Sequence, residues 1–228
     1  YTAYSVRREI GRGGSCIVYD ASSTDNLGND KLVRIKECYP HALRISRSEE
    51  GMLHAADRDS EAFEAAKQRL IDAYQKNHAL FATEELSNNV ANTSNLYEEN
   101  GTIYIVSTWL NGKTFADAEI KTLHDCIALV LSTARVLKNI HDAGYLYLDL
   151  KPENILTIKG SLDLVQLFDF DSMIAMSDLE EAVRSNDSAA FRTSYTRGYV
   201  PLEQQTGKLR QIGRHSDLYS LGAVLFEA

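Results

Sequence analysis

The stretch from Gly144 to Ile158, GYLYLDLKPENILTI, constrains this chain most, because it places an acid, a base and an amide within six residues. These residues are Asp149, Lys151 and Asn154, and the proline between the last two stiffens the turn. The apolar run from Ile155 to Ile158 follows at once and predicts a short strand. The sequence therefore predicts a polar, chemically active turn that leads directly into a strand.

A buried helix is predicted just before this turn. Residues 118 to 141 carry apolar side chains at helical spacing, and Gly144 is typical of the residue that ends a helix. The apolar positions are Leu123, Ile127, Val130, Leu131, Ala134, Leu137 and Ile140. We expect His124 and His141 to lie at the surface or at an interface rather than to act as ligands. A turn framed by a helix and a strand is more specific than an isolated acidic turn.

The composition is that of a soluble globular protein. The chain has 228 residues, of which 44% are hydrophobic and 25% charged, enough for one large domain or two small lobes. Its net charge of -8 argues against a general nucleic-acid binder, because affinity for a phosphate backbone needs clustered Lys and Arg.

The cysteines and the termini indicate a cytoplasmic chain. Cys16, Cys38 and Cys126 are far apart and form no Cys-x-x-Cys pair, so their spacing supports neither a disulfide framework nor a zinc site. No apolar run approaches the roughly 20 residues of a membrane span, and no signal peptide is recognisable. Because the chain starts without methionine and stops inside an apolar run, we interpret it as a fragment.

The first third of the chain alternates short strand patterns with turns. The runs 4–10, 16–21 and 31–38 are rich in Val, Ile and Tyr, which predicts an antiparallel sheet. Residues 39–57 form a long polar connection, interpreted as a loop or a short helix. Residues 59–78 show a helical apolar stripe, and residues 101–106 predict another strand.

The stretch described first resembles the catalytic loop of the protein kinases, H-R-D-L-x-x-x-N, with Tyr147 and Leu148 in place of its first two residues. The resemblance implies that Asp149 accepts or orients the proton of the substrate hydroxyl and that Lys151 neutralises the transferring phosphoryl group. It implies that Asn154 holds a magnesium ion. A lysine two residues after the aspartate is similar to the serine/threonine kinases and favours Ser or Thr as acceptor.

Downstream segments resemble further kinase motifs. Asp169-Phe170-Asp171 is similar to D-F-G, which implies that Asp169 is the main magnesium ligand, although a strand-end acidic turn would carry the same letters. Because Asp171 lacks the freedom of glycine, we expect this segment to flip less readily between active and inactive arrangements. The segment from Thr196 to Glu203 resembles T-x-x-Y-x-A-P-E and implies that Thr196 helps to seat the acceptor.

Two further implications concern control and support of the loop. Because Leu148 stands where many kinases have arginine, activation by phosphorylation of the loop is less expected. Ser216 to Gly222 is similar to the start of the central helix of the lower lobe, which implies that Asp217 braces the catalytic loop.

Upstream, GRGGSCIVY resembles the kinase glycine-rich loop, with Gly11, Gly13 and Val18 in place and Cys16 where the third glycine belongs. The run from Val33 to Lys36 is similar to V-A-I-K, whose lysine pairs with ATP phosphates. An ordinary glycine-rich hairpin would explain the first of these sequences, and a solvated lysine at a strand end would explain the second.

The resemblance also implies a glutamate partner and a hinge. Glu64 or Glu61 on the helix 59–78 would pair with Lys36, and Glu64 is slightly favoured over Glu61, although most glutamates on such a helix face solvent. Backbone groups of Thr108 and Leu110 would face the adenine, although a plain exit from a strand explains this segment too.

Together these motifs predict an α+β, two-lobed, protein-kinase-like fold, with an N-terminal lobe over residues 1–110 and an incomplete C-terminal lobe over 111–228. The implied function is a serine/threonine protein kinase that uses ATP and Mg²⁺ on protein substrates. No nucleic-acid partner or membrane segment is expected. Two alternatives remain: a pseudokinase that binds nucleotide or acts as a scaffold, and a small-molecule phosphotransferase, against which residues 196–203 and the Asp217 motif argue.

Overall fold

The computed structural model describes residues 3–24, 28–82, 93–109, 112–118, 120–158, 161–186 and 196–227. The chain divides into two compact units. Unit 1 comprises Tyr1–His78 and Asn92–Trp109, and unit 2 comprises Ala79–Ala91 and Leu110–Ala228. Each unit has its own hydrophobic core and is described by itself.

Unit 1 is built on a five-stranded antiparallel sheet in the order β1-β2-β3-β7-β6. The strands are β1 (Tyr4–Arg12), β2 (Cys16–Thr24), β3 (Asp30–Cys38), β6 (Thr93–Glu99) and β7 (Thr102–Thr108). The antiparallel sheet predicted from the sequence is confirmed. Glycines and Ser15 at the β1–β2 turn separate the first two strands, as their turn propensity predicts.

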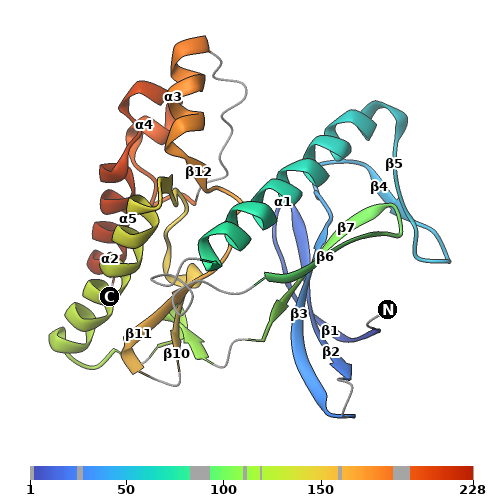
Figure 1. Cartoon of the computed structure of the whole chain (residues 1–228), viewed down its shortest axis with the longest axis horizontal. Coiled ribbons are helices and arrows are strands. Elements are labelled where there is room, and N and C mark those ends of the chain that lie inside the picture. The colour runs from blue at the N-terminus through green and yellow to red at the C-terminus, as the bar shows by residue number, and fades with distance from the viewer. Residues whose placement is uncertain are drawn as a thin grey trace. The chain divides into compact units, whose positions relative to one another are not determined.

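The two faces of this sheet pack differently because side chains alternate along a strand. One face packs against the helix α1 (Ser60–Phe81), which runs across the sheet in Figure 1. That contact buries Cys16, Cys38, Phe63, Ala66, Leu70, Ile103 and Ile105. The opposite face buries Ala21, Val33, Ile35 and Val106 among partly buried tyrosines. The helical stripe read from the sequence is therefore the face of α1 that covers the sheet.

The connection between β3 and α1 is a β-hairpin, so its interpretation as a loop or short helix was wrong. Its strands are β4 (Ile45–Arg47) and β5 (Leu53–Ala55), followed by the turn η1 (Asp57–Asp59). Long-range contacts stabilise the hairpin: Leu53 is buried, its N–H donates to the carbonyl of Asn100, and Arg47 forms an ion pair with Glu37. None of these partners is local in sequence, so local propensity did not reveal them.

Unit 2 joins helices to two small sheets. The sheets are β11-β10-β8 and β12-β9. Its elements are β8 (Gly112–Thr114), η2 (Phe115–Asp117), α2 (Leu123–Asp142), β9 (Tyr145–Leu146), η3 (Pro152–Asn154), β10 (Ile155–Ile158), β11 (Ser161–Leu167), β12 (Ile174–Ala175), α3 (Met176–Ser185), α4 (Leu202–Gln205), η4 (Leu209–Gln211) and α5 (Arg214–Glu227).

The helix α2 begins later than the sequence pattern predicted, at Leu123 instead of residue 118. A capping box sets this start: Thr122 Oγ1 accepts from Asp125 N, and the Asp125 carboxylate accepts from Thr122 N. The helix ends before Gly144, which has a positive φ of 88° that glycine adopts without strain.

The core of unit 2 lies where α2, α5, β10 and β11 meet, and Figure 1 shows α2 and α5 side by side. It contains Leu129, Val136, Leu137, Ile140, Tyr147, Ile155, Leu167, Phe170, Leu221 and Val224. The predicted turn between α2 and β10 is thus anchored at both ends in this core.

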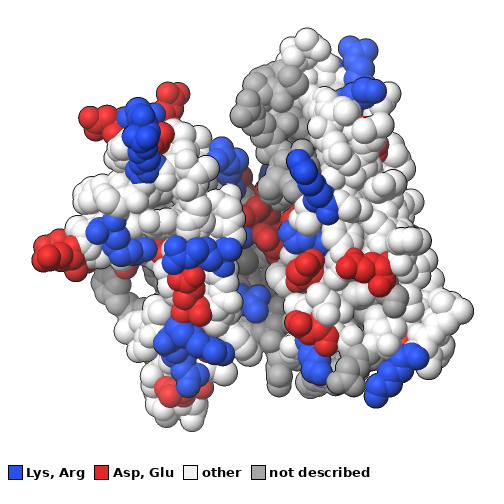
Figure 2. Space-filling view, turned by 180° about the vertical axis from the view of Figure 1, so that it is seen from behind, with Lys and Arg blue, Asp and Glu red and all other residues white. Residues whose placement is uncertain are grey.

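The surface of the described residues mixes charges of both signs. On the face in Figure 2, Lys and Arg side chains are interspersed with Asp and Glu. Among the described helices, none combines the length and the apolar character that crossing a membrane requires.

Candidate active site

The three residues predicted as catalytic meet in unit 2. Lys151 Nζ lies 2.9 Å from Asp149 Oδ2 and donates to Thr196 Oγ1 at 3.0 Å. The Thr196 hydroxyl in turn donates to Asp149 Oδ1 at 3.3 Å. Thr196 reaches this cluster from a position 47 residues away in sequence. The result is a carboxylate with an ammonium on one oxygen and a hydroxyl on the other.

Asn154 is fixed next to this carboxylate. Its amide Nδ2 donates to the carbonyl of Asp149 at 2.9 Å and to Asp149 Oδ2 at 3.3 Å. The side chain is buried, on the short turn η3 that Pro152 begins. Because its N–H groups are used toward Asp149, its amide oxygen faces elsewhere and receives no hydrogen bond from a described residue.

A backbone hydrogen bond brings the acidic segment 169–171 close to η3. Phe168 N donates to the carbonyl of Asn154 at 3.3 Å, which places Asp169 at the end of β11 beside η3. Asp169 has a φ of 65°, a left-handed conformation that is uncommon outside glycine. Strain of this kind is often found at functional sites.

Burial raises the pKa of Asp149 above its usual value of 3.8. The adjacent Lys151 opposes this shift, and the negative charge of Asp169 adds to it. A carboxylate with a raised pKa is a better proton acceptor than an ordinary aspartate, provided it is still ionised. The site thus holds two acids whose charges repel and one ammonium that stabilises them.

Asp217 braces the catalytic loop, as predicted. This fully buried carboxylate on α5 accepts from Tyr147 N at 2.9 Å and from Leu148 N at 2.7 Å. Leu148 has a φ of 63°, and a left-handed leucine costs about 1–2 kcal/mol. The hydrogen bonds that these backbone N–H groups donate to Asp217 therefore hold the loop in a conformation that its local sequence would not adopt alone.

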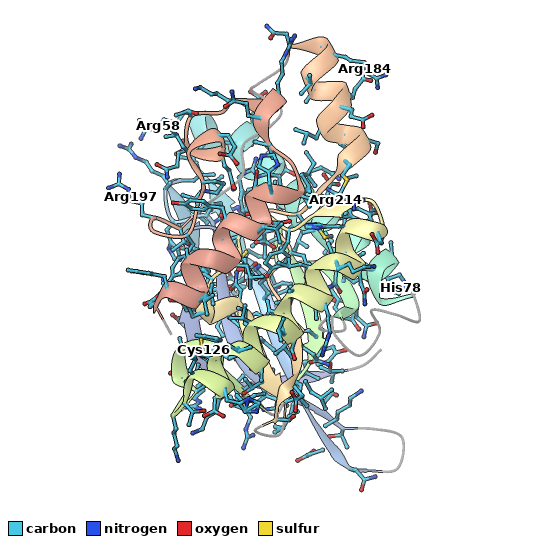
Figure 3. All side chains as sticks on the ribbon, turned by 90° about the vertical axis from the view of Figure 1, so that its left-hand side faces the viewer. Arg58, His78, Cys126, Arg184, Arg197 and Arg214 are labelled. Carbon is cyan, nitrogen blue, oxygen red and sulfur yellow. The ribbon has the colours of Figure 1, made fainter. Side chains whose placement is uncertain are left out.

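Three supporting residues were not found from the sequence. His141 was expected at a surface or interface, but it is buried and its Nε2 lies 2.8 Å from Asp217 Oδ2. Gln204 on α4 donates from Nε2 to the carbonyl of Leu148 at 2.8 Å. Arg214, labelled in Figure 3 at the start of α5, donates to the carbonyl of His141 at 3.2 Å. No local motif signals such contacts, because they join residues more than fifty positions apart.

Tyr147 links the catalytic loop to the acidic segment. Its phenol donates to the carbonyl of Phe168, and its ring meets that of Phe170 edge to face with centroids 5.5 Å apart. Complete burial and the surrounding carboxylates raise the pKa of Tyr147 well above 10, so the phenol stays a hydrogen-bond donor. The residue that replaces the histidine of the kinase motif therefore positions the backbone next to Asp169.

The end of the segment 196–203 is also fixed to α5. Ser216 Oγ donates to Glu203 Oε1 at 2.8 Å, and His215 Nε2 lies 3.7 Å from the same oxygen. A serine and a histidine of α5 therefore contact Glu203.

Unit 1 brings together most of the residues predicted to bind nucleotide. Gly11 pairs with Val18 across β1 and β2, and Val18 pairs with Lys36 across β2 and β3. Opposite residues of an antiparallel pair lie on the same face, so Val18 and Lys36 share the face that α1 covers. Gly13 lies in the adjoining turn, where its N–H donates to the carbonyl of Cys16 at 2.9 Å. Thr108 ends β7, and Leu110 falls outside the described residues.

The predicted partner of Lys36 is not in place. Glu64 forms an ion pair of 2.7 Å with Lys67 on its own helix, and its side chain is 64% exposed. Phe63 takes the sheet-facing position, and the next residue on a helix is rotated by about 100° away from it. Glu61 is exposed as well. Neither candidate glutamate therefore pairs with Lys36 in this structure.

The donor set in unit 2 fits a hard divalent cation. Among the described residues, no three His, Cys, Asp or Glu side chains form a metal cluster. The chemistry instead offers one carboxylate, Asp169, and the amide oxygen of Asn154, and oxygen ligands of this kind suit Mg²⁺ together with substrate phosphates and water. The direction of the Asn154 amide, set by its bonds to Asp149, supports this fit.

Comparison with known proteins gives a consistent result. The family described as protein kinase domain matches residues 4–228. A probable serine/threonine-protein kinase PknB of Lactococcus lactis is 28% identical over 229 residues, which covers 98% of this chain and 31% of that protein. The probable serine/threonine-protein kinase SCO3848 of Streptomyces coelicolor is also 28% identical and is covered over 29% of its length.

A solved structure is similar as well. The structure titled PpkA-294 apo form has a TM-score of 0.71 and 25% identity, and the alignment covers 98% of this chain and 74% of that chain. This similarity confirms the predicted fold class. The chain spans about a third of the length of the curated relatives it matches.

Proposed function

The chain belongs to the protein kinase domain family, and on this premise we propose that it transfers the γ-phosphoryl group of ATP to serine or threonine hydroxyls of protein substrates. The observation that carries the proposal is the contact of Asp149 with Lys151, Thr196 and Asn154. The names of the bacterial relatives support the same acceptor class.

In this proposal Asp149 receives the proton of the acceptor hydroxyl. Its raised pKa suits a base that must be ionised near neutral pH and still attract a proton. Lys151, 2.9 Å from the base, carries the positive charge that the transferring phosphoryl group needs. Thr196 contacts both and orients the acceptor end of the site.

Asn154 and Asp169 would hold Mg²⁺ through their side-chain oxygens. When bound, the ion neutralises charge on the nucleotide phosphates. Asn154 can take this role because Asp149 already fixes its amide nitrogen. Asp169 is placed by the hydrogen bond from Tyr147 to the preceding carbonyl.

Unit 1 would bind the nucleotide. Gly11 and Gly13 allow backbone N–H groups near phosphates, and Val18 offers apolar surface beside Lys36. Lys36 would contact the phosphates. Thr108 and Leu110 are proposed to contact the adenine through their backbone groups.

The Glu64–Lys67 ion pair favours a second candidate, a nucleotide-binding pseudokinase. An active kinase needs its strand lysine held by a glutamate of the following helix. For the chain to be active, Glu64 would have to exchange Lys67 for Lys36. The two candidates thus differ in a measurable ion pair.

The test is a phosphoryl-transfer assay on the whole protein with Mg-ATP and a generic protein acceptor. Asp149→Asn and Lys36→Met should abolish transfer. Asp163→Asn and Lys31→Met, exposed matched controls on β11 and β3, should keep it. No transfer with ATP still bound would overturn the kinase and support the pseudokinase. Transfer of the phosphoryl group to small molecules only would overturn both the protein kinase and the pseudokinase.

A further inference from the structure

Two cysteines that are far apart in sequence lie opposite each other in unit 1. Cys16 on β2 pairs in register with Cys38 on β3. Both side chains are buried, 5% and 1% exposed, and both are thiols in this structure. They belong to the same core cluster under α1, so they lie on one face of the sheet.

The hydrogen bonding around this pair brings the two side chains close. Tyr39 N donates to the carbonyl of Ser15 at 2.9 Å, so the bond joins the residue after Cys38 to the residue before Cys16. That pattern defines a non-hydrogen-bonded antiparallel pair, in which the Cα atoms are about 4.5 Å apart. A disulfide needs a Cα separation of about 4.4–6.8 Å. The backbone is therefore already within the range of a cross-strand disulfide.

We propose that Cys16 and Cys38 form a modification site, an intrachain disulfide that fixes the glycine-rich turn between β1 and β2 to the end of β3. The oxidant is a low-molecular-weight disulfide. One cysteine thiolate attacks it, forms a mixed disulfide and releases one thiolate. The thiolate of the second cysteine then attacks the mixed disulfide and displaces the small thiolate that remains in it. Two cysteine thiols are oxidised, one small disulfide is reduced to two thiols, and these take up the two protons.

The glycine-rich turn offers the route to the buried thiols. Residues 13–15 are exposed, and a Cβ added at Gly14 would meet nothing within 4 Å. The turn is held by bonds from Gly13 N to the Cys16 carbonyl and from His41 N to the Gly14 carbonyl. Opening these bonds exposes Cys16 first. Because a buried thiol reacts only when it is exposed, the reaction should be slow and should accelerate at low concentrations of urea.

The link would act on the residues proposed to bind phosphates. Cys16 follows Gly11 and Gly13, and Cys38 lies two residues beyond Lys36 on the same face of β3. A covalent bond between them removes the freedom of the turn relative to that strand. Backbone amides of residues 11–16 should therefore exchange hydrogen more slowly after oxidation.

The experiment treats the folded whole protein with oxidised glutathione at about pH 8.5, near the pKa of an ordinary thiol. Wild type has three thiols and should retain one, with a peptide that joins Cys16 to Cys38 in the mass map and full reversal by dithiothreitol. Cys126→Ser should still form the link, because Cys126 lies on α2 in unit 2 (Figure 3). Cys16→Ser and Cys38→Ser should form none.

Two outcomes would overturn the proposal. One is that all three thiols persist in oxidised glutathione at a urea concentration at which the backbone amides of residues 13–16 exchange their hydrogens during the incubation. The other is a link of Cys126 to Cys16 or Cys38 in place of the Cys16–Cys38 link, which would show that the two cysteines of the sheet do not react with each other. Neither depends on a folded Cys16 variant, since wild type and Cys126→Ser suffice. If the proposed kinase function holds, ADP should also leave the oxidised protein more slowly; absence of nucleotide binding in both redox states would count against that function and not against the disulfide.

Discussion

The replacement of Asp217 by asparagine tests whether α5 holds the catalytic loop. The carboxylate accepts from three donors: Oδ2 from Tyr147 N and His141 Nε2, and Oδ1 from Leu148 N. Asparagine has the same shape but turns one of these oxygens into an NH₂ group. Whichever way the amide lies, at least one buried backbone N–H then loses its acceptor.

The expected cost follows from that single lost acceptor. A buried donor left without a partner destabilises a protein by about 1–3 kcal/mol. For a chain of this size that corresponds to a fall in Tm of roughly 2–12 °C. Alanine would remove the acceptor of all three donors, a loss of about 3–9 kcal/mol, comparable to a total stability of about 5–15 kcal/mol. Asparagine is therefore the informative variant.

Urea unfolding, followed by circular dichroism, measures this prediction. Asp163→Asn is the matched control, because Asp163 is exposed on β11 and should change stability by less than about 0.5 kcal/mol. Asp217→Asn should also lower phosphoryl transfer, since it releases the loop that carries Asp149. An Asp217→Asn protein with the midpoint and m-value of wild type would refute the argument that these hydrogen bonds support the loop.

Other substitutions test separate contacts. Tyr147→Phe should lose about 1–3 kcal/mol in urea unfolding, because a backbone carbonyl loses its donor; an unchanged midpoint would contradict that contact. Arg47→Met should destabilise by up to about 3 kcal/mol, since buried Glu37 keeps only its two tyrosine donors, whereas exposed Arg44→Met should have little effect. Folding raises the pKa of Asp149, so the carboxyl group binds a proton more tightly in the folded chain than in the unfolded chain. The stability that Asp149 contributes through this proton is therefore largest below pH 3.8 and is lost as pH rises. Between pH 4 and pH 7 the urea midpoint of Asp149→Asn should therefore rise relative to that of wild type. Curves of midpoint against pH that run parallel for the two proteins would contradict the raised pKa.

The parts of the site that the sequence predicted are those with short sequence separation or a motif. Asp149, Lys151 and Asn154 lie within one turn, so their proximity follows from chain connectivity. Thr196 and Asp217 are far from this turn, and only the resemblance to kinase motifs pointed to them. Runs rich in Val, Ile and Tyr predicted the sheet of unit 1, and several of these side chains are buried in the cores on its two faces.

The parts that were missed depend on partners distant in sequence. Glu37 follows Lys36 and looks like a solvated residue, but it is 1% exposed and accepts from Tyr19, Tyr104 and Arg47. Neither its burial nor the hairpin that brings in Arg47 has a local signature. Glu64 was misjudged for a related reason: a helical stripe identifies the buried face of a helix, whereas the choice of ion-pair partner depends on which basic residue is nearer.

Leu148 shows how a departure from a motif acquires a structural meaning. Many kinases carry arginine at this position, where it can pair with a phosphorylated segment. Here the side chain is 2% exposed in a cluster with Leu146 of β9, Leu179 and Ala182 of α3, Leu209 of η4 and Ile212, which follows η4. Its N–H and C=O are both satisfied, by Asp217 and Gln204, which holds the leucine in a left-handed conformation. α3 and η4 therefore dock on the catalytic loop through apolar contacts with Leu148. Because apolar burial does not depend on added charge, this docking requires no phosphate.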